Sequence, residues 1–147
     1  MTSPVKAATV VKTGEVARVL IDSDVLIWLT RGNANAVAVV QNTPDWVISA
    51  VSYMELAQGC RNKTELKAIQ KAFKSGDNDA QPDILPITQT INNLACSLIE
   101  KYALSDSMHM AGALIAATAI THSLPLLTAN NKYFSAIDGL KIQVFKL

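Results

Sequence analysis

The sequence contains few of the residues that mark several classes of protein. It has only two cysteines, Cys60 and Cys96, and they form no CxxC pair. Two distant cysteines are typical of buried thiols in a reduced protein, and not of a disulfide-stabilised one. The longest apolar runs, such as residues 113–117, are far too short to cross a bilayer, and polar residues within 13–18 interrupt any signal-peptide pattern. We therefore expect a cytoplasmic protein that does not associate with a membrane.

Charge of either sign is also scarce. Charged residues make up 17% of the chain, the net charge is +1, and half of the residues are apolar. This composition excludes general disorder and predicts one compact domain. Any contact with nucleic acid must then come from a local basic patch. We expect the domain to span residues 18–147, preceded by a poorly ordered extension of residues 1–17 with weak periodicity.

Short apolar, β-branched runs alternate with segments of helical periodicity along this domain. The expected strands are residues 18–21, 45–48, 84–87, 124–128 and 142–145. One helix is expected to follow Asp22 and to end at Gly32, another is expected to begin at Ser52, and the others cover residues 34–41, 63–74, 88–102 and 108–121. Residues 75–79 are expected to form a loop. Such alternation implies a parallel sheet covered by helices on both faces. The sequence therefore predicts an α/β fold that binds ligands at the carboxyl ends of its strands.

Two acidic residues, Asp22 and Glu55, each follow an expected strand. Each also has a purely structural explanation. Asp22 is suited to cap a helix, and Ser52 with Glu55 forms a capping box. Together, however, carboxylates that converge at one edge of a sheet repel each other unless a cation lies between them. Mg²⁺ or Mn²⁺ suits such an oxygen site, where it activates water for attack on a phosphodiester.

Four segments of the chain carry a more specific pattern. They are residues 19–29 (VLIDSDVLIWL), 48–59 (ISAVSYMELAQG), 113–119 (ALIAATA) and 124–130 (LPLLTAN), the last with Phe134. In this order and at this spacing, they resemble the motifs of the PIN domain family, and in particular VapC-like toxins. The resemblance covers about residue 18 to the C-terminus.

The resemblance implies a three-layer α/β/α sandwich around a central, mainly parallel sheet of four to five strands. It also implies a Mg²⁺- or Mn²⁺-dependent endoribonuclease that is the toxin of a toxin–antitoxin pair. Asp22 and Glu55 would be its metal ligands, and Asn130 would join them as a catalytic residue. The implied partners are an RNA substrate, a cognate antitoxin protein and a second copy of the chain in a homodimer.

The sequence departs from the family at Gly112, where the third motif carries an aspartate. Glycine inside a helix costs about 1 kcal/mol relative to alanine, yet no turn or cap in the sequence calls for one here. Close packing of an Ala-rich helix is one structural explanation. Asp106 is a poor substitute for the missing acid, because six residues along a helix place it on another face. A site with one carboxylate fewer is expected to bind metal weakly.

Three explanations for Gly112 remain open. The chain is a natural degenerate relative, a weakly active enzyme with fewer ligands, or a variant engineered or selected to spare its host from an RNA-cleaving toxin. Restoring the carboxylate by Gly112→Asp, followed by an assay of RNA cleavage, is the test that the sequence suggests.

Other polar residues near the expected sheet edge are secondary candidates. Thr128 and Asn130 in the fourth motif are expected to contact substrate or metal-bound water, although Asn also suits a turn. Arg31 and Arg61 follow the first two motifs and are expected to bind phosphate, because arginine makes paired contacts with it. Asp24 either joins the site or interacts with the first turn of its helix.

Two other functions are compatible with these residues. In a haloacid-dehalogenase-type phosphatase, Asp22 would be the nucleophile and Asp24 the acid, but the chain is short for that fold and lacks its later motifs. A catalytically defective PIN scaffold that binds antitoxin or RNA is the alternative that Gly112 favours.

Overall fold

The structure is a computed structural model that describes residues 18–74 and 81–146. The expected N-terminal extension and the expected loop at 75–79 lie outside the described residues. The described residues form a five-stranded sheet in the order β3-β2-β1-β4-β5, and all four strand pairs are parallel. The strands are β1 (Arg18–Ile21), β2 (Asp45–Ser49), β3 (Ile84–Leu85), β4 (Leu126–Thr128) and β5 (Ile142–Val144). β3 is shorter than expected because Pro86 has no N–H to donate to a neighbouring strand.

Seven helices complete the described part of the chain. They are α2 (Ser23–Thr30), α3 (Ala34–Gln41), α4 (Ala50–Gln58), α5 (Lys63–Phe73), α6 (Gln89–Asp106), α7 (Met110–Thr121) and α8 (Asn131–Phe134). The short helix α8 was not expected from the sequence. No helix in the described ranges is long and apolar enough to span a membrane.

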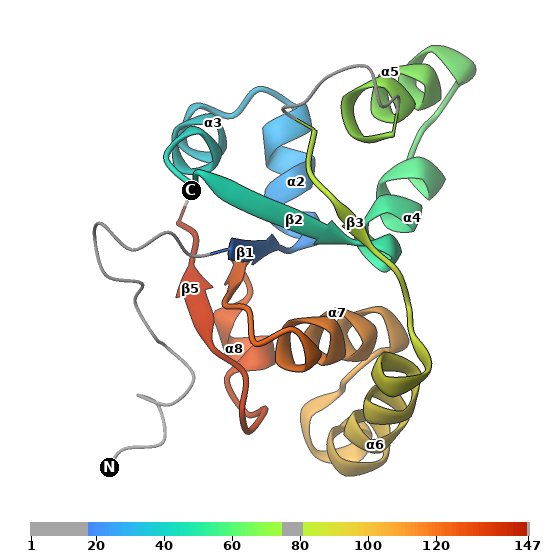
Figure 1. Cartoon of the computed structure of the whole chain (residues 1–147), viewed down its shortest axis with the longest axis vertical. Coiled ribbons are helices and arrows are strands. Elements are labelled where there is room, and N and C mark those ends of the chain that lie inside the picture. Colours follow the sequence, from blue (N-terminus) through green and yellow to red (C-terminus); the bar gives the residue numbers. More distant parts are fainter. Residues whose placement is uncertain (1–17, 75–80, 147) are drawn as a thin grey trace.

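The helices cover both faces of the sheet (Figure 1). One face packs against α6, α7 and α8, and the other packs against α2, α3 and α5. Helix α4 contributes Val51 to the first core and Leu56 to the second. Successive strand residues point to opposite faces, so Leu20 lies in the first core while Val19 and Ile21 lie in the second. The predicted α/β/α fold is confirmed, with a fully parallel sheet.

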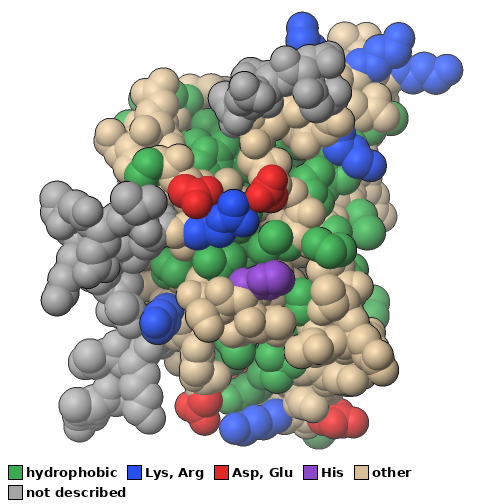
Figure 2. Space-filling view, in the orientation of Figure 1, with side chains coloured by type: hydrophobic (Ala, Val, Ile, Leu, Met, Phe, Trp, Pro, Cys, Tyr) green, Lys and Arg blue, Asp and Glu red, His purple; other side chains and the backbone are tan. Residues whose placement is uncertain are grey.

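The sheet carries different side chains where its strands begin, at its amino edge, and where they end, at its carboxyl edge. At the amino edge, Arg18 pairs with Asp45 at 3.2 Å and with Asp83 at 3.0 Å, which links the starts of β1, β2 and β3. Figure 2 shows acidic side chains on both sides of a basic one on this face. These exposed pairs contribute little stability. The candidate acids lie at the opposite, carboxyl edge.

Two local expectations are wrong. Helix α4 begins at Ala50, with Ser49 as its N-cap, so Ser52 lies inside the helix and forms no capping box with Glu55. Both thiols are free, as expected, but Cys96 is exposed and Cys60 is only partly buried. Neighbouring Ala95 faces the core instead, because consecutive helical residues point in different directions.

The N-cap of α4 provides a test of this boundary. Ser49 is fully buried and its hydroxyl accepts the Val51 N–H at 3.0 Å. We expect Ser49→Ala to lower the free energy of unfolding by about 1 kcal/mol in urea titrations, because the amide loses its partner. Ser97→Ala, at an exposed serine of α6, is the control. An equal effect of both substitutions would contradict the assigned cap.

Candidate active site

Asp22 and Thr128 meet at the carboxyl edge of the sheet. Each lies at the end of a strand, and β1 and β4 are neighbours with Ile21 paired to Leu127. The Thr128 hydroxyl donates to Asp22 Oδ2 at 2.7 Å, and it accepts the Asn130 N–H at 3.0 Å. Thr128 is fully buried and Asp22 is 6% exposed. The first and fourth motifs thus form one hydrogen-bonded cluster.

Ser23 joins Asp22 to Glu55. Its backbone N–H donates to Asp22 Oδ1 at 2.8 Å, and its hydroxyl donates to Glu55 Oε1 at 2.5 Å. The Ser23 hydroxyl also contacts the buried Ser52 hydroxyl at 3.2 Å. Two carboxylates separated by 33 positions are therefore held by a single residue. Sequence analysis missed Ser23, although its place directly after Asp22 could have drawn attention to it.

The structural explanation of Asp22 also holds, because this carboxylate is the N-cap of α2. The capping-box explanation of Glu55 does not hold. Since α4 begins three residues earlier than expected, Glu55 lies in the second half of the helix and its carboxylate reaches Ser23 of α2.

Asp24 has a structural role in the first turn of α2. Its Oδ1 accepts the Val25 N–H at 2.7 Å, and its Oδ2 accepts the Ala129 N–H at 3.0 Å. Oδ2 also lies 3.4 Å from the Thr128 hydroxyl. Asp24 thus connects α2 to the residue that follows β4, and both of its oxygens are engaged by backbone amides.

The cluster is negatively charged and largely shielded from water. The pKa of Asp22 is raised to about 7, mainly by burial and then by the charge of Asp24, while hydrogen bonds from Thr128 and Ser23 oppose the shift. Burial also raises the pKa of Asp24. Within residues 18–74 and 81–146, no ion pair reaches Asp22, Asp24 or Glu55. Uncompensated acids of this kind suit a cation with oxygen ligands.

The number of ligands is small. Among the described residues, no group of three or more His, Cys, Asp or Glu side chains is placed to hold a metal ion. Asp22 and Glu55 fit a divalent cation as two carboxylate donors, with water completing its coordination as Mg²⁺ prefers.

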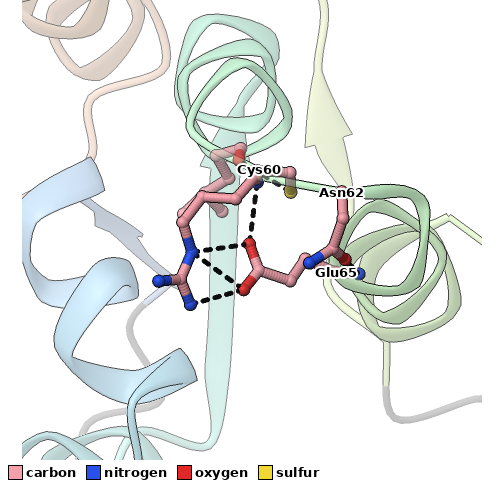
Figure 3. A network of polar contacts seen from close by, with 5 residues as sticks. Cys60, Asn62 and Glu65 are labelled. Carbon is pink, nitrogen blue, oxygen red and sulfur yellow. Dashed lines mark hydrogen bonds and ion pairs between the residues drawn. The ribbon is translucent and has the colours of Figure 1, made fainter.

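A groove of 650 Å³ between α2, α4 and α5 contains Glu55, Arg31 and Arg61. Both arginines line this groove, and each already contacts another side chain. The Arg61 guanidinium pairs with Glu65 at 2.8 Å, in the network shown in Figure 3. The Arg31 guanidinium lies 5.6 Å from the centre of the Trp28 ring. Three of the predicted site residues therefore share a surface that is separate from the buried Asp22–Thr128 pair but joined to it through Glu55.

Gly112 has a local reason that the sequence did not reveal. The Tyr133 ring lies directly against it, and a Cβ at position 112 would come within 2.6 Å of a ring carbon. Asp106 is the last residue of α6, exposed to solvent, and does not share a helix with Gly112. Of the explanations open from the sequence, close packing at this position therefore has a specific neighbour, the Tyr133 ring, and no turn or cap is involved.

Comparisons with known proteins identify chains that share this fold. The chain is similar to a toxin–antitoxin complex from Klebsiella pneumoniae, at 28% identity over 83% of this chain and 94% of that chain, with a TM-score of 0.67. It shares its fold with VapBC2 from Rickettsia felis bound to a promoter DNA fragment (16% identity, 88% and 99% coverage, TM-score 0.73). It also shares it with VapBC-1 from nontypeable Haemophilus influenzae (22% identity, 87% and 98% coverage, TM-score 0.66).

No curated protein matches the sequence. The family profile of the PIN domain matches residues 19–140, which include both carboxylates, Thr128 and Gly112. The chain therefore belongs to the PIN domain family.

Proposed function

We propose that the chain is a VapC-like endoribonuclease, the toxin of a toxin–antitoxin pair, with a metal site weakened by the absence of a third carboxylate. The observation that carries the proposal is the shared hydrogen bonding of Asp22 and Glu55 to Ser23. Two acids linked through one serine at the carboxyl edge of a parallel sheet, without a cation from the described residues, are suited to a divalent ion.

Each residue of the site has a defined part in this proposal. Asp22 and Glu55 hold Mg²⁺ or Mn²⁺, which when bound supplies an activated water and charge stabilisation for phosphodiester hydrolysis. Thr128 orients Asp22 through its hydroxyl. Asn130 is exposed and its side chain does not cap α8, so its amide oxygen is free to hold a water.

The groove between α2, α4 and α5 is proposed to receive the RNA backbone. Arg31 and Arg61 are its cations, and both are exposed. Arg61 must leave Glu65 to bind phosphate, and it can do so because a fully exposed ion pair of this kind adds little stability. A cognate antitoxin is proposed to cover the same groove and block Glu55. The homodimer and the cytoplasmic location stay predictions.

A catalytically defective scaffold that binds antitoxin or RNA is the second candidate, favoured by the closed space at Gly112. The phosphatase alternative is not proposed. Both oxygens of Asp24 accept hydrogen bonds from backbone N–H groups, so Asp24 is not free to act as the acid beside Asp22.

The test is cleavage of a short fluorescent RNA by the purified chain in Mn²⁺ or Mg²⁺. We expect Asp22→Asn and Glu55→Gln each to lower the cleavage rate about 100-fold or more, because each removes a charged ligand. Glu100→Gln, at an exposed residue of α6, is the matched control. Cleavage that survives both site substitutions would exclude this site. Wild-type protein that binds antitoxin but cuts no RNA would favour the scaffold.

A further inference from the structure

Tyr133 fills the space beside Gly112. A Cβ built on Gly112 would collide with the Tyr133 hydroxyl and would lie 2.6 Å and 2.9 Å from two carbons of its ring. Real Cβ atoms essentially never come within 3.0 Å of such atoms. A side chain at position 112 therefore requires Tyr133 to move.

Tyr133 is held in this place by three contacts. Its hydroxyl accepts the His109 N–H at 2.7 Å, and its ring stacks on the His109 ring with the centres 6.5 Å apart. The ring also packs edge-on against buried Phe134, at 4.8 Å between centres. His109 is the N-cap of α7 and its own side chain makes no cap hydrogen bond. The Tyr133 hydroxyl thus supplies a partner at the start of α7, and its displacement would cost that bond and the ring contacts.

Gly112 and Tyr133 lie towards the same edge of the sheet as the acidic cluster. Helix α7 leads into the amino end of β4, so its own first turn, with Gly112, lies towards the carboxyl edge of the sheet. Tyr133 reaches the same place from the other direction, five residues after Thr128. The third acidic position expected from the family motif therefore lies towards the same edge of the sheet as Asp22, and the space beside it is filled by a phenol ring.

We propose that Gly112 and Tyr133 are a coupled pair in which the tyrosine ring closes the third acidic position, so that Gly112→Asp alone does not restore a three-carboxylate site. Tyr133 acts by occupying space, and it is not a catalytic residue. This inference rests on the proposed function where it concerns metal, but its steric part does not. Restoring the third carboxylate therefore requires substitution of both Gly112 and Tyr133, and not of Gly112 alone as the sequence suggested.

The steric part is tested by thermal unfolding in EDTA. Gly112→Ala is measured in the wild-type and Tyr133→Ala backgrounds, with Tyr133→Leu as a second background that retains contact with Phe134 should Tyr133→Ala fail to fold. Alanine favours the helix in either background, so only the collision distinguishes them. We expect the change in Tm caused by Gly112→Ala to be about 4 °C more favourable in the Tyr133→Ala background than in the wild type. Equal changes in both backgrounds would overturn the pair.

A Tyr133→Phe background separates the ring from its hydroxyl. The ring carbons remain close to position 112 without the hydroxyl. Gly112→Ala is therefore expected to remain unfavourable relative to the Tyr133→Ala background. Full relief by Tyr133→Phe would show that the hydroxyl alone is the obstacle and would overturn closure by the ring.

The metal part is tested by calorimetric titration with MnCl₂. We expect Gly112→Asp with Tyr133→Ala to bind Mn²⁺ about tenfold tighter than the wild type, because affinity rises with the number of charged ligands. Gly112→Asn with Tyr133→Ala is the neutral control and should show no such gain. Gly112→Asp alone should also show none.

Two results would overturn this part. Equal affinities of the Asp and Asn double variants would mean that position 112 does not reach the ion. A full gain from Gly112→Asp alone would mean that Tyr133 does not close the position. If the double variant gains Mn²⁺ affinity but no variant cleaves RNA, the pair is supported and the nuclease proposal fails.

Discussion

Asp22→Asn is expected to raise the free energy of unfolding by about 3 kcal/mol at pH 8 and by only about 1 kcal/mol at pH 5, in the absence of divalent ions. The carboxylate is 6% exposed, and its pKa in the folded protein is about 7, against an ordinary 3.8. Burial is the main cause and the charge of Asp24 the second. The substitution removes this buried charge while the asparagine side-chain oxygen still accepts the Ser23 N–H.

The direction of the pH dependence follows from the raised pKa. Between about pH 4 and pH 7 the folded protein retains a proton on Asp22 that the unfolded chain has released. Raising the pH through this window therefore lowers the free energy of unfolding of the wild type, and this loss is absent from the Asp22→Asn variant. A buried carboxylate that leaves the folded protein less stable than a neutral side chain would is typical of a functional site.

Urea unfolding at pH 5 and pH 8 in EDTA provides the measurement. Asp106→Asn is the matched control, because Asp106 is exposed and forms no ion pair among the described residues. It should change the stability by less than about 0.5 kcal/mol at either pH. A pH-independent effect of Asp22→Asn would show that this carboxylate is ionised normally.

Thr128→Val is expected to have the opposite effect and to lower the free energy of unfolding by about 3 kcal/mol at pH 8. The shape of the side chain is kept, so no cavity forms. What is lost is the hydroxyl that donates to Asp22 Oδ2 and accepts the Asn130 N–H. Because this hydrogen bond lowers the pKa of Asp22, its loss matters more when Asp22 is charged, and the effect should shrink at pH 5.

Thr128→Ser separates the hydroxyl from the methyl group. It keeps the donor and loses one buried methyl, at a cost of about 1 kcal/mol that does not depend on pH. The comparison of the two variants by urea unfolding at both pH values isolates the hydrogen bond. If valine cost no more than serine at pH 8, Thr128 would not support the Asp22 carboxylate.

Much of the fold was predictable because it depends on local pattern. The strand at 18–21 and the helix at 34–41 match β1 and α3 to the residue. The boundaries that were missed had local competitors. Ser49 and Ser52 both suit a helix cap, and only the structure shows that Ser49 accepts the Val51 N–H. This three-residue difference determines whether Glu55 closes a capping box or accepts a hydrogen bond from Ser23.

The candidate site was predictable in its acids and not in their connections. By itself, the sequence determined the order of strands and helices, the placement of Asp22 and Glu55 after strands, and that of Thr128 at the end of one. Apolar periodicity and motif spacing are properties of neighbouring residues. Only the tertiary structure decided that Ser23 holds both carboxylates, that Glu65 engages Arg61, and that Tyr133 fills the space at Gly112. The first and third of these contacts join separate motifs through side chains whose directions depend on the packing of whole helices against the sheet. No pattern within one segment specifies such a contact.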